Sequence, residues 1–143
     1  MKGRILISFL LVSFAFSFQG YGQDARKTAK KLNAGIDRKL DSLTAIKADT
    51  IAYYKVIKHL MRDAVLCDHF DAMADKKGRS NPRYRFLNQK RLSSFLPLLV
   101  DAGMYEYGLR KNDEAMQYFN LYLDCIDGPL FHGNDNHRRL VAY

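Results

Sequence analysis

The sequence predicts an all-α fold, with about four to five helices joined in antiparallel hairpins. Apolar residues recur at spacings of three and four in several successive segments after residue 22, which is the periodicity of helices that bury one face. The alternation of apolar and polar residues that is typical of strands is missing from these segments. Turn-forming pairs such as Asn81-Pro82 and Gly128-Pro129 separate them, as expected for helices connected by loops.

The first 22 residues have the features of a secretory signal peptide. Lys2 and Arg4 form a basic start, the stretch 5–18 is apolar and serine-rich, and Gly20 and Gly22 are small residues at the positions that a signal peptidase requires. The apolar stretch is shorter than the roughly 20 residues of a membrane-spanning helix. We therefore expect an exported mature chain that begins near Gln23, lacks a transmembrane segment and is periplasmic or secreted.

The mature chain should form one helical domain over residues 23–131, with a flexible tail over 132–143. The whole chain has 143 residues and a net charge of +8, and it stays basic without Lys2 and Arg4. The polyanions outside the cytoplasm are lipid headgroups, cell-wall polymers and acidic glycans. We therefore expect no nucleic-acid partner, although a basic cytoplasmic protein would suggest one.

The first two helices are expected over residues 24–47 and about 50–74. Leucine and isoleucine recur at spacings of four, four and three in the first of these segments, between charged residues. Asp49-Thr50 supplies an N-cap for the second helix. This second helix has apolar residues on two sides, so we expect it to lie at the centre of the fold and to pack against more than one neighbour.

A basic segment over residues 76–91 should connect the two halves of the domain. It contains turn formers, Gly78 and Asn81-Pro82 among them, and it lacks acidic residues. Tyr84 and Phe86 lie between the charges, so the segment could grip a polyanion by charge and stacking. A solvated linker followed by a helix face explains the composition equally well. The basic residues are Lys76, Lys77, Arg79, Arg83, Arg85, Lys90 and Arg91.

Helical periodicity resumes near Arg83 and continues beyond the linker. Pro97 marks either a kink or the first turn of a new helix, with Ser93 or Ser94 as its cap. The next helix covers about residues 98–109. Asn112-Asp113 should cap a last helix, which Gly128-Pro129 ends.

The segment 97–129 resembles one degenerate tetratricopeptide repeat, a unit of two helices and about 34 residues. Ala115 matches the small residue that begins the family's second helix, Gly103 matches the glycine of the first helix, and Phe119 matches the large aromatic residue of the second. Leu99 and Glu106 stand where the family usually has Trp and Tyr. The order of segments also looks like exported tetratricopeptide-like proteins of Gram-negative bacteria.

The resemblance implies a right-handed array of helical hairpins that binds proteins. Either the hairpin packs back on the helices of residues 24–74, or the chain is a shortened relative of longer arrays, and the second interpretation is slightly favoured. In this family the first helix of a repeat lines a groove for partner peptides. The matching residues here are Pro97, Val100, Met104 and Tyr107. The alternative role for these four residues is ordinary core or cover for a neighbouring helix.

Chemistry-bearing residues are few and scattered. Cys67 and Cys125 enter an oxidising compartment, which permits one disulfide, and the alternative is two separately buried thiols. His59, Asp63 and Cys67 share a helix face but span about 12 Å, too far for one metal ion. The histidines of the segment 132–137 fit a plain chain end. We expect no catalytic residues, no metal and no cofactor, and the leading function is an interaction adaptor in the envelope.

Overall fold

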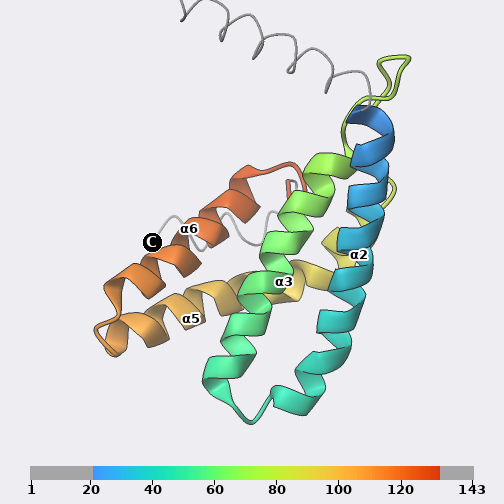
Figure 1. Cartoon of the computed structure of the whole chain (residues 1–143). Helices are drawn as coiled ribbons and strands as arrows, with labels where there is room; N and C mark the ends of the chain where they lie inside the picture. The colour runs from blue at the N-terminus through green and yellow to red at the C-terminus, as the bar shows by residue number, and fades with distance from the viewer. Residues whose placement is uncertain (1–20, 133–143) are drawn as a thin grey trace, which may run out of the picture.

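The computed structural model describes residues 21–132, and all its regular elements are helices (Figure 1). The helices are α2 (Tyr21–Ile46), α3 (Thr50–Asp71), α4 (Arg85–Leu92), the short 3₁₀ helix η1 (Ser93–Phe95), α5 (Leu96–Gly108) and α6 (Asn112–Asp127). Within this range there is no strand, so the predicted all-α class is confirmed. Residues 1–20 of the predicted signal peptide and residues 133–143 of the predicted tail lie outside the described residues.

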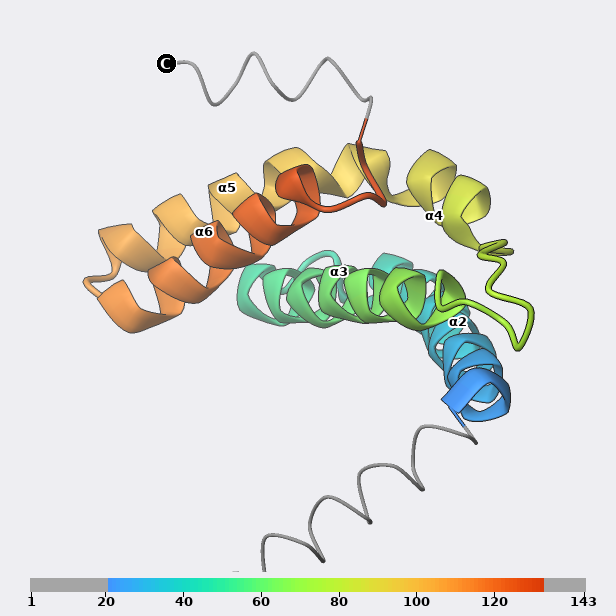
Figure 2. The same ribbon diagram turned by 90° about the horizontal axis from the view of Figure 1, so that it is seen from above.

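The helices form two antiparallel hairpins, α2–α3 and α5–α6, which α4 and the preceding loop connect (Figure 1). Seen from above, α3 lies between α2 and the second hairpin (Figure 2). It packs against α2 on one side and against α5 and α6 on the other. The two apolar sides of its sequence therefore have the two neighbours that a central helix requires.

The core follows the apolar spacing of the sequence. In α2, Ile36 and Leu43 are buried, and Leu32 and Leu40 pack at the edge of the same cluster. The side chains with no exposed surface come from α2, α3, α4, α5 and α6, so one core joins both hairpins. They include Ile36, Ile57, Leu60, Met61, Leu92, Leu96 and Leu99.

A buried lysine also ties α3 to α6. Lys58 is only 8% exposed, and its Nζ donates a hydrogen bond of 3.2 Å to Gln117 Oε1. The same ammonium group lies 5.1 Å from the ring centroid of the buried Tyr118. A buried ammonium needs such partners, because burial without them is costly.

The cap of α3 is the one that the sequence predicts, but two other predicted caps are wrong. Asp49 Oδ1 accepts a hydrogen bond of 3.1 Å from the Ala52 N–H. Ser93 does not cap α5, because its hydroxyl donates to the Gln89 carbonyl at the end of α4. Lys111, not Asn112 or Asp113, is the residue before α6, and it makes no side-chain capping bond. Pro97 lies in the first turn of α5, where its missing N–H leaves no helical bond unmade.

The second helix, α3, ends at Asp71, three residues before its predicted end. Polar groups of Asp71 and Ala72 form hydrogen bonds with the following loop, and the chain leaves the helix there. Asp71 Oδ2 accepts a 2.7 Å bond from the Tyr84 N–H, and the Ser80 hydroxyl donates a 2.6 Å bond to the Ala72 carbonyl. These bonds fold the loop back over the end of α3. The segment 76–91 is therefore a loop up to Tyr84 and a helix from Arg85 onward.

Candidate functional site

The two helices of the last hairpin cross closely at Gly103 and Phe119. A Cβ atom placed on Gly103 would lie 2.7 Å from Cδ1 and 2.8 Å from Cζ of Phe119, closer than carbon atoms can pack. Ala115, at the start of α6, is only 2% exposed. The structure thus places the Phe119 ring in the space that Gly103 leaves, and it buries Ala115 at the start of α6.

An apolar face remains open on the side of this hairpin that turns away from α3. On α5 the spacing of four and three places Val100, Met104 and Tyr107 on one stripe, and on α6 the spacing of three and four aligns Met116, Phe119 and Leu123. We call these six residues the outer face. The inward stripe, which includes Leu99, Ala102, Tyr118 and Leu121, is buried in the core.

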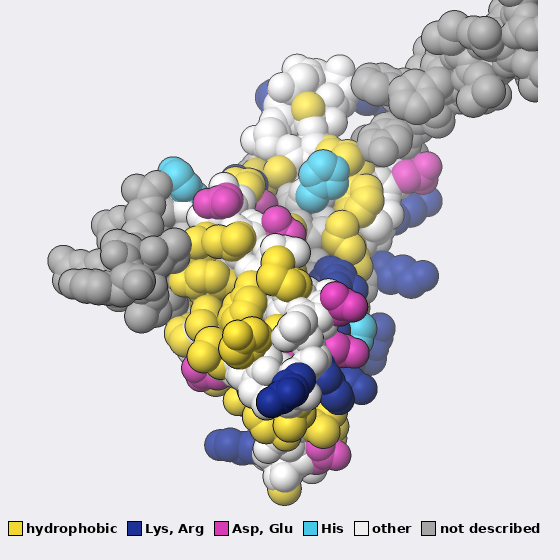
Figure 3. All heavy atoms as spheres, turned by 90° about the vertical axis from the view of Figure 1, so that its left-hand side faces the viewer, with side chains coloured by type: hydrophobic (Ala, Val, Ile, Leu, Met, Phe, Trp, Pro, Cys, Tyr) yellow, Lys and Arg dark blue, Asp and Glu magenta, His cyan; other side chains and the backbone are white. Residues whose placement is uncertain are grey.

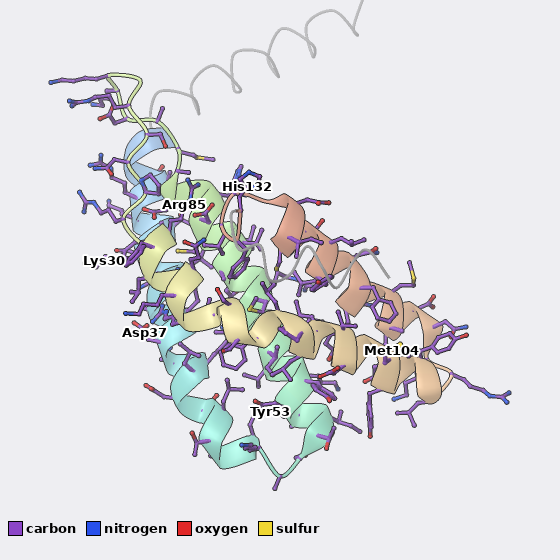
Figure 4. The ribbon with its side chains drawn as sticks, turned by 180° about the vertical axis from the view of Figure 1, so that it is seen from behind. Lys30, Asp37, Tyr53, Arg85, Met104 and His132 are labelled. Atoms are coloured by element: carbon purple, nitrogen blue, oxygen red, sulfur yellow. The ribbon has the colours of Figure 1, made fainter. Side chains whose placement is uncertain are left out.

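The outer face exposes large apolar side chains. Met104 is 59% exposed, Tyr107 61%, Met116 54% and Leu123 43%. Figure 3 looks at the free end of the hairpin, where hydrophobic side chains gather, and Figure 4 places Met104 near the end of α5. Contiguous apolar surface of this kind marks interaction sites on proteins.

The predicted groove residues fall into two groups. Met104 and Tyr107 are exposed, whereas Pro97 and Val100 are half-buried, and Val100 packs against the core. The stripe therefore serves both of the predicted roles: the residues in the first turns of α5 cover the core, and those in its last turns face solvent, where a partner could bind. The sequence alone did not indicate the α6 half of the face, Met116 and Leu123, although their helical spacing on each side of Phe119 was a usable signal.

The last hairpin is acidic, in contrast to the rest of the chain. Asp101 on α5 and Asp113 and Asp127 on α6 are exposed and adjoin the outer face at helical spacings of three or four residues from Met104, Met116 and Leu123. Arg110 and Lys111 are the hairpin's basic residues, both in the turn between the helices. The acidic residues of the hairpin are Asp101, Glu106, Asp113, Glu114, Asp124 and Asp127.

Three of the seven basic residues assigned to polyanion contact have carboxylate partners. Arg85 donates two bonds to Asp68, from Nε at 2.8 Å and from Nη2 at 2.9 Å. Arg91 bonds to Asp37 and Asn33 of α2 and to Asn88 of its own helix. These two arginines hold α4 against α3 and α2, so they are not free ligands for a polymer.

The third pair is a surface contact between Arg79 and Asp75, with 3.5 Å between Nε and Oδ2. The remaining four basic residues of the set are exposed: Lys76, Lys77, Arg83 and Lys90. The structure thus divides the set into two arginines that dock α4 and five residues at the surface.

The two cysteines are not joined in a disulfide; both are free and buried. The reason is that Cys67, on α3, faces α2, whereas Cys125 lies on α6, on the other side of α3. The Cys67 thiol donates a 3.4 Å bond to the Ala29 carbonyl of α2. Burial raises the pKa of each thiol to about 12, so both stay protonated near neutral pH, which is the unreactive form.

The potential metal ligands do not converge. Asp63 Oδ2 forms an ion pair with Lys39 Nζ of α2 at 2.6 Å, His59 is exposed, and Cys67 faces α2. Among the residues that the structure describes, no three His, Cys, Asp or Glu side chains are grouped as a metal site would need. No helix in the same range is both long and apolar enough to cross a membrane.

The clefts between α3 and α6 are small or open. One of about 140 Å³ is lined by Asp68 and His69 of α3 and by Cys125 and Leu130 from the second half of the chain. Of its two carboxylates, Asp68 is already bound to Arg85, and Asp124 is exposed. A more open cleft of about 400 Å³ lies between Leu66 on α3 and Asn120 on α6. Neither combines an apolar enclosure with convergent polar groups, as small-molecule sites do.

Alkaline pH is expected to destabilise the protein between about pH 9 and pH 12. Burial raises the pKa of both thiols from 9.0 to about 12, and burial, with a smaller effect of Glu106, raises the pKa of Tyr118 from 10.0 to about 12. In this window the unfolded chain loses protons that the folded chain retains, so stability falls as pH rises; the contribution of these three groups is fully present below about pH 9. Urea unfolding midpoints across this range measure the effect.

The Cys125→Ala variant is the control for this titration. It should show a shallower fall, because one of the buried groups is gone. A midpoint that stays constant up to pH 12 would contradict the assignment.

Comparisons of the chain with protein-family models, curated proteins and solved structures gave no match. The class of protein is therefore described from its fold and its surface alone. The described residues form an all-α protein of two packed helical hairpins, the second of which leaves an apolar face open to solvent.

Proposed function

We propose that this chain is an exported, tetratricopeptide-like helical module that binds a protein partner in the cell envelope through the outer face of α5–α6. The observation that carries the proposal is the exposure of Met104, Tyr107, Met116 and Leu123 on one side of a hairpin whose other side is core. Methionine and tyrosine suit such a role, because both make large, adaptable contacts.

The partner that fits this face is an amphipathic helix. Two neighbouring helices that cross closely present their apolar stripes side by side, and a third helix can pack an apolar stripe of its own against them. In helical arrays, each hairpin covers the open face of its neighbour in the same way. The close crossing at Gly103 and Phe119 keeps the two stripes of the outer face adjacent.

The negative charge around the outer face favours a partner helix with basic residues beside its apolar stripe. Asp101, Asp113 and Asp127 are exposed beside the outer face, so basic residues on both sides of the partner's apolar stripe would be attracted and acidic ones repelled. Such complementarity sets the choice of partner and its orientation more than the affinity itself. The proposed partner is therefore a basic amphipathic helix.

Two synthetic helical peptides test the proposal directly. Both carry the same leucine stripe, one with lysine flanks and the other with glutamate flanks. The lysine peptide should bind the mature chain at least about tenfold more tightly in fluorescence anisotropy, since like charges beside the face oppose the other peptide. The Met104→Ala/Tyr107→Ala variant should lose at least about tenfold in affinity for the lysine peptide.

The matched control is Ile51→Ala/Leu66→Ala, which removes two exposed apolar side chains of α3 outside the face. It should bind like the unchanged protein. Equal losses in both double variants would contradict the face assignment. Unfolding of the Met104→Ala/Tyr107→Ala variant would instead assign these two residues to structural packing.

A further inference from the structure

The fold brings two basic segments, far apart in the sequence, to the same end of the molecule. The loop 72–84 lies beside the first turns of α2 (Figure 1). The pKa of the Asp75 carboxyl in this loop is lowered, chiefly by the Arg79 N–H and further by the charge of Arg26 on α2. Arg26 therefore lies close to the loop, although 49 positions separate it from Asp75.

We call the eight basic residues of this region the basic end. Four come from α2 and four from the loop, and all are exposed. They are Arg26, Lys27, Lys30, Lys31, Lys76, Lys77, Arg79 and Arg83. Figure 4 shows Lys30 on the part of α2 that lies next to α4.

The nearby carboxylates offset little of this charge. Asp75 Oδ1 accepts bonds from the Lys77 N–H at 2.8 Å and the Arg79 N–H at 3.0 Å, and its Oδ2 lies 3.5 Å from Arg79 Nε, so it shapes the loop and offsets the charge of one arginine of the basic end. Asp71 holds the Tyr84 N–H, and Asp68 is paired with Arg85. Asp24 is exposed at the start of α2. The basic end therefore keeps a positive surplus.

Exposed apolar side chains follow the basic loop directly in the sequence. Phe86 is 77% exposed and Leu87 is 46% exposed, both in the first turn of α4, directly after the basic loop. The opposite side of α4 carries Asn88 and Leu92, which are buried. Phe86 is therefore open to solvent, where core packing does not require it, and the exposed Lys90 follows one helical turn later.

We propose that the basic end, together with Phe86 and Leu87, binds the surface of an anionic lipid membrane. Lysine and arginine attract anionic headgroups, while an exposed Phe and Leu can enter the boundary between headgroups and acyl chains. A soluble acidic polymer offers charge but no such boundary for Leu87. The combination of charge and aliphatic surface favours the membrane over a glycan. This surface is separate from the outer face and does not depend on the proposed function.

The test uses the chain from Gln23 onward, whose described core residues lie between Ala25 and Phe131, with phosphatidylcholine vesicles that contain or lack phosphatidylglycerol. Co-sedimentation should show binding to the anionic vesicles only, weakened steeply by salt. Lys27→Gln/Lys77→Gln should weaken binding at least about fivefold. Phe86→Ser should weaken it severalfold without a change of charge.

The charge-matched control is Lys47→Gln/Lys55→Gln, because both lysines are exposed near the opposite end of the α2–α3 hairpin. This variant should bind vesicles like the unchanged chain. Equal losses in the two double variants would overturn the proposal, since binding would then follow net charge alone. Tight binding to heparin, with vesicle binding insensitive to Phe86→Ser, would overturn it in favour of a soluble polyanion.

Discussion

Replacing Arg85 by alanine should lower the free energy of unfolding by about 3 kcal/mol. The Asp68 carboxylate is 3% exposed and receives both guanidinium bonds of Arg85. Without Arg85 this carboxylate would remain buried with its charge uncompensated, and α4 would lose its main anchor on α3. Urea unfolding followed by far-ultraviolet circular dichroism measures the loss.

Arg79→Ala provides the matched control for the Arg85 prediction. Arg79 also pairs with an aspartate, but its side chain is 70% exposed, so its replacement should change the stability by no more than about 0.5 kcal/mol. Adding Asp68→Ala to Arg85→Ala should recover part of the loss, because the buried charge disappears. Equal effects of the two arginine replacements would show that Arg85 does not anchor α4.

Gly103→Ala should destabilise the protein by about 1–2 kcal/mol. The new methyl group would lie 2.7 Å from Phe119 Cδ1, and overpacking of this kind costs about 1–3 kcal/mol. Alanine recovers part of this, since glycine within a helix costs up to about 1 kcal/mol relative to alanine. Thermal or urea unfolding of the variant measures the balance.

Gly35→Ala is expected to have the opposite sign. Gly35 also lies inside a helix, but an added Cβ would meet only side-chain atoms at 3.8 Å or more, so alanine should stabilise α2 by up to about 1 kcal/mol. Adding Phe119→Ala to Gly103→Ala should show favourable coupling, since the clash is removed. If both glycine variants gained stability, the close crossing of α5 and α6 would be wrong.

Much of the fold could be predicted from local sequence signals. The spacing of Ile36 and Leu43 indicates the buried side of α2, Asp49 indicates the start of α3, and Gly128-Pro129 indicates the end of α6. Each of these signals acts within a few residues, where helix periodicity and capping are decisive. The caps predicted at Ser93 and Asn112 were wrong: Ser93 lies in η1, which runs directly into α5, and its hydroxyl bonds to Gln89, while Asn112 is already the first residue of α6.

The surface sites could be predicted only in part, because they depend on contacts between distant segments. The pairing of Arg85 with Asp68 turns a residue of the basic segment into an internal anchor, and no local signal distinguishes Arg85 from Arg83. The approach of α2 to the loop 72–84 likewise creates the basic end only in three dimensions. On α5, Met104 and Tyr107 were indicated by the repeat resemblance, but their partners on α6 follow from the packing of Phe119 on Gly103.

The measurement that tests the central proposal most directly is a chemical-shift titration of the isotope-labelled mature chain with the lysine-flanked helical peptide. The proposed function predicts that the largest shifts fall on the outer face: Val100, Met104, Tyr107, Met116, Phe119 and Leu123. Residues of α2 should shift little, and the Met104→Ala/Tyr107→Ala variant should need at least about tenfold more peptide for the same change. Shifts centred on α2 or on the α3–α6 cleft, or no shifts at saturating peptide, would contradict it.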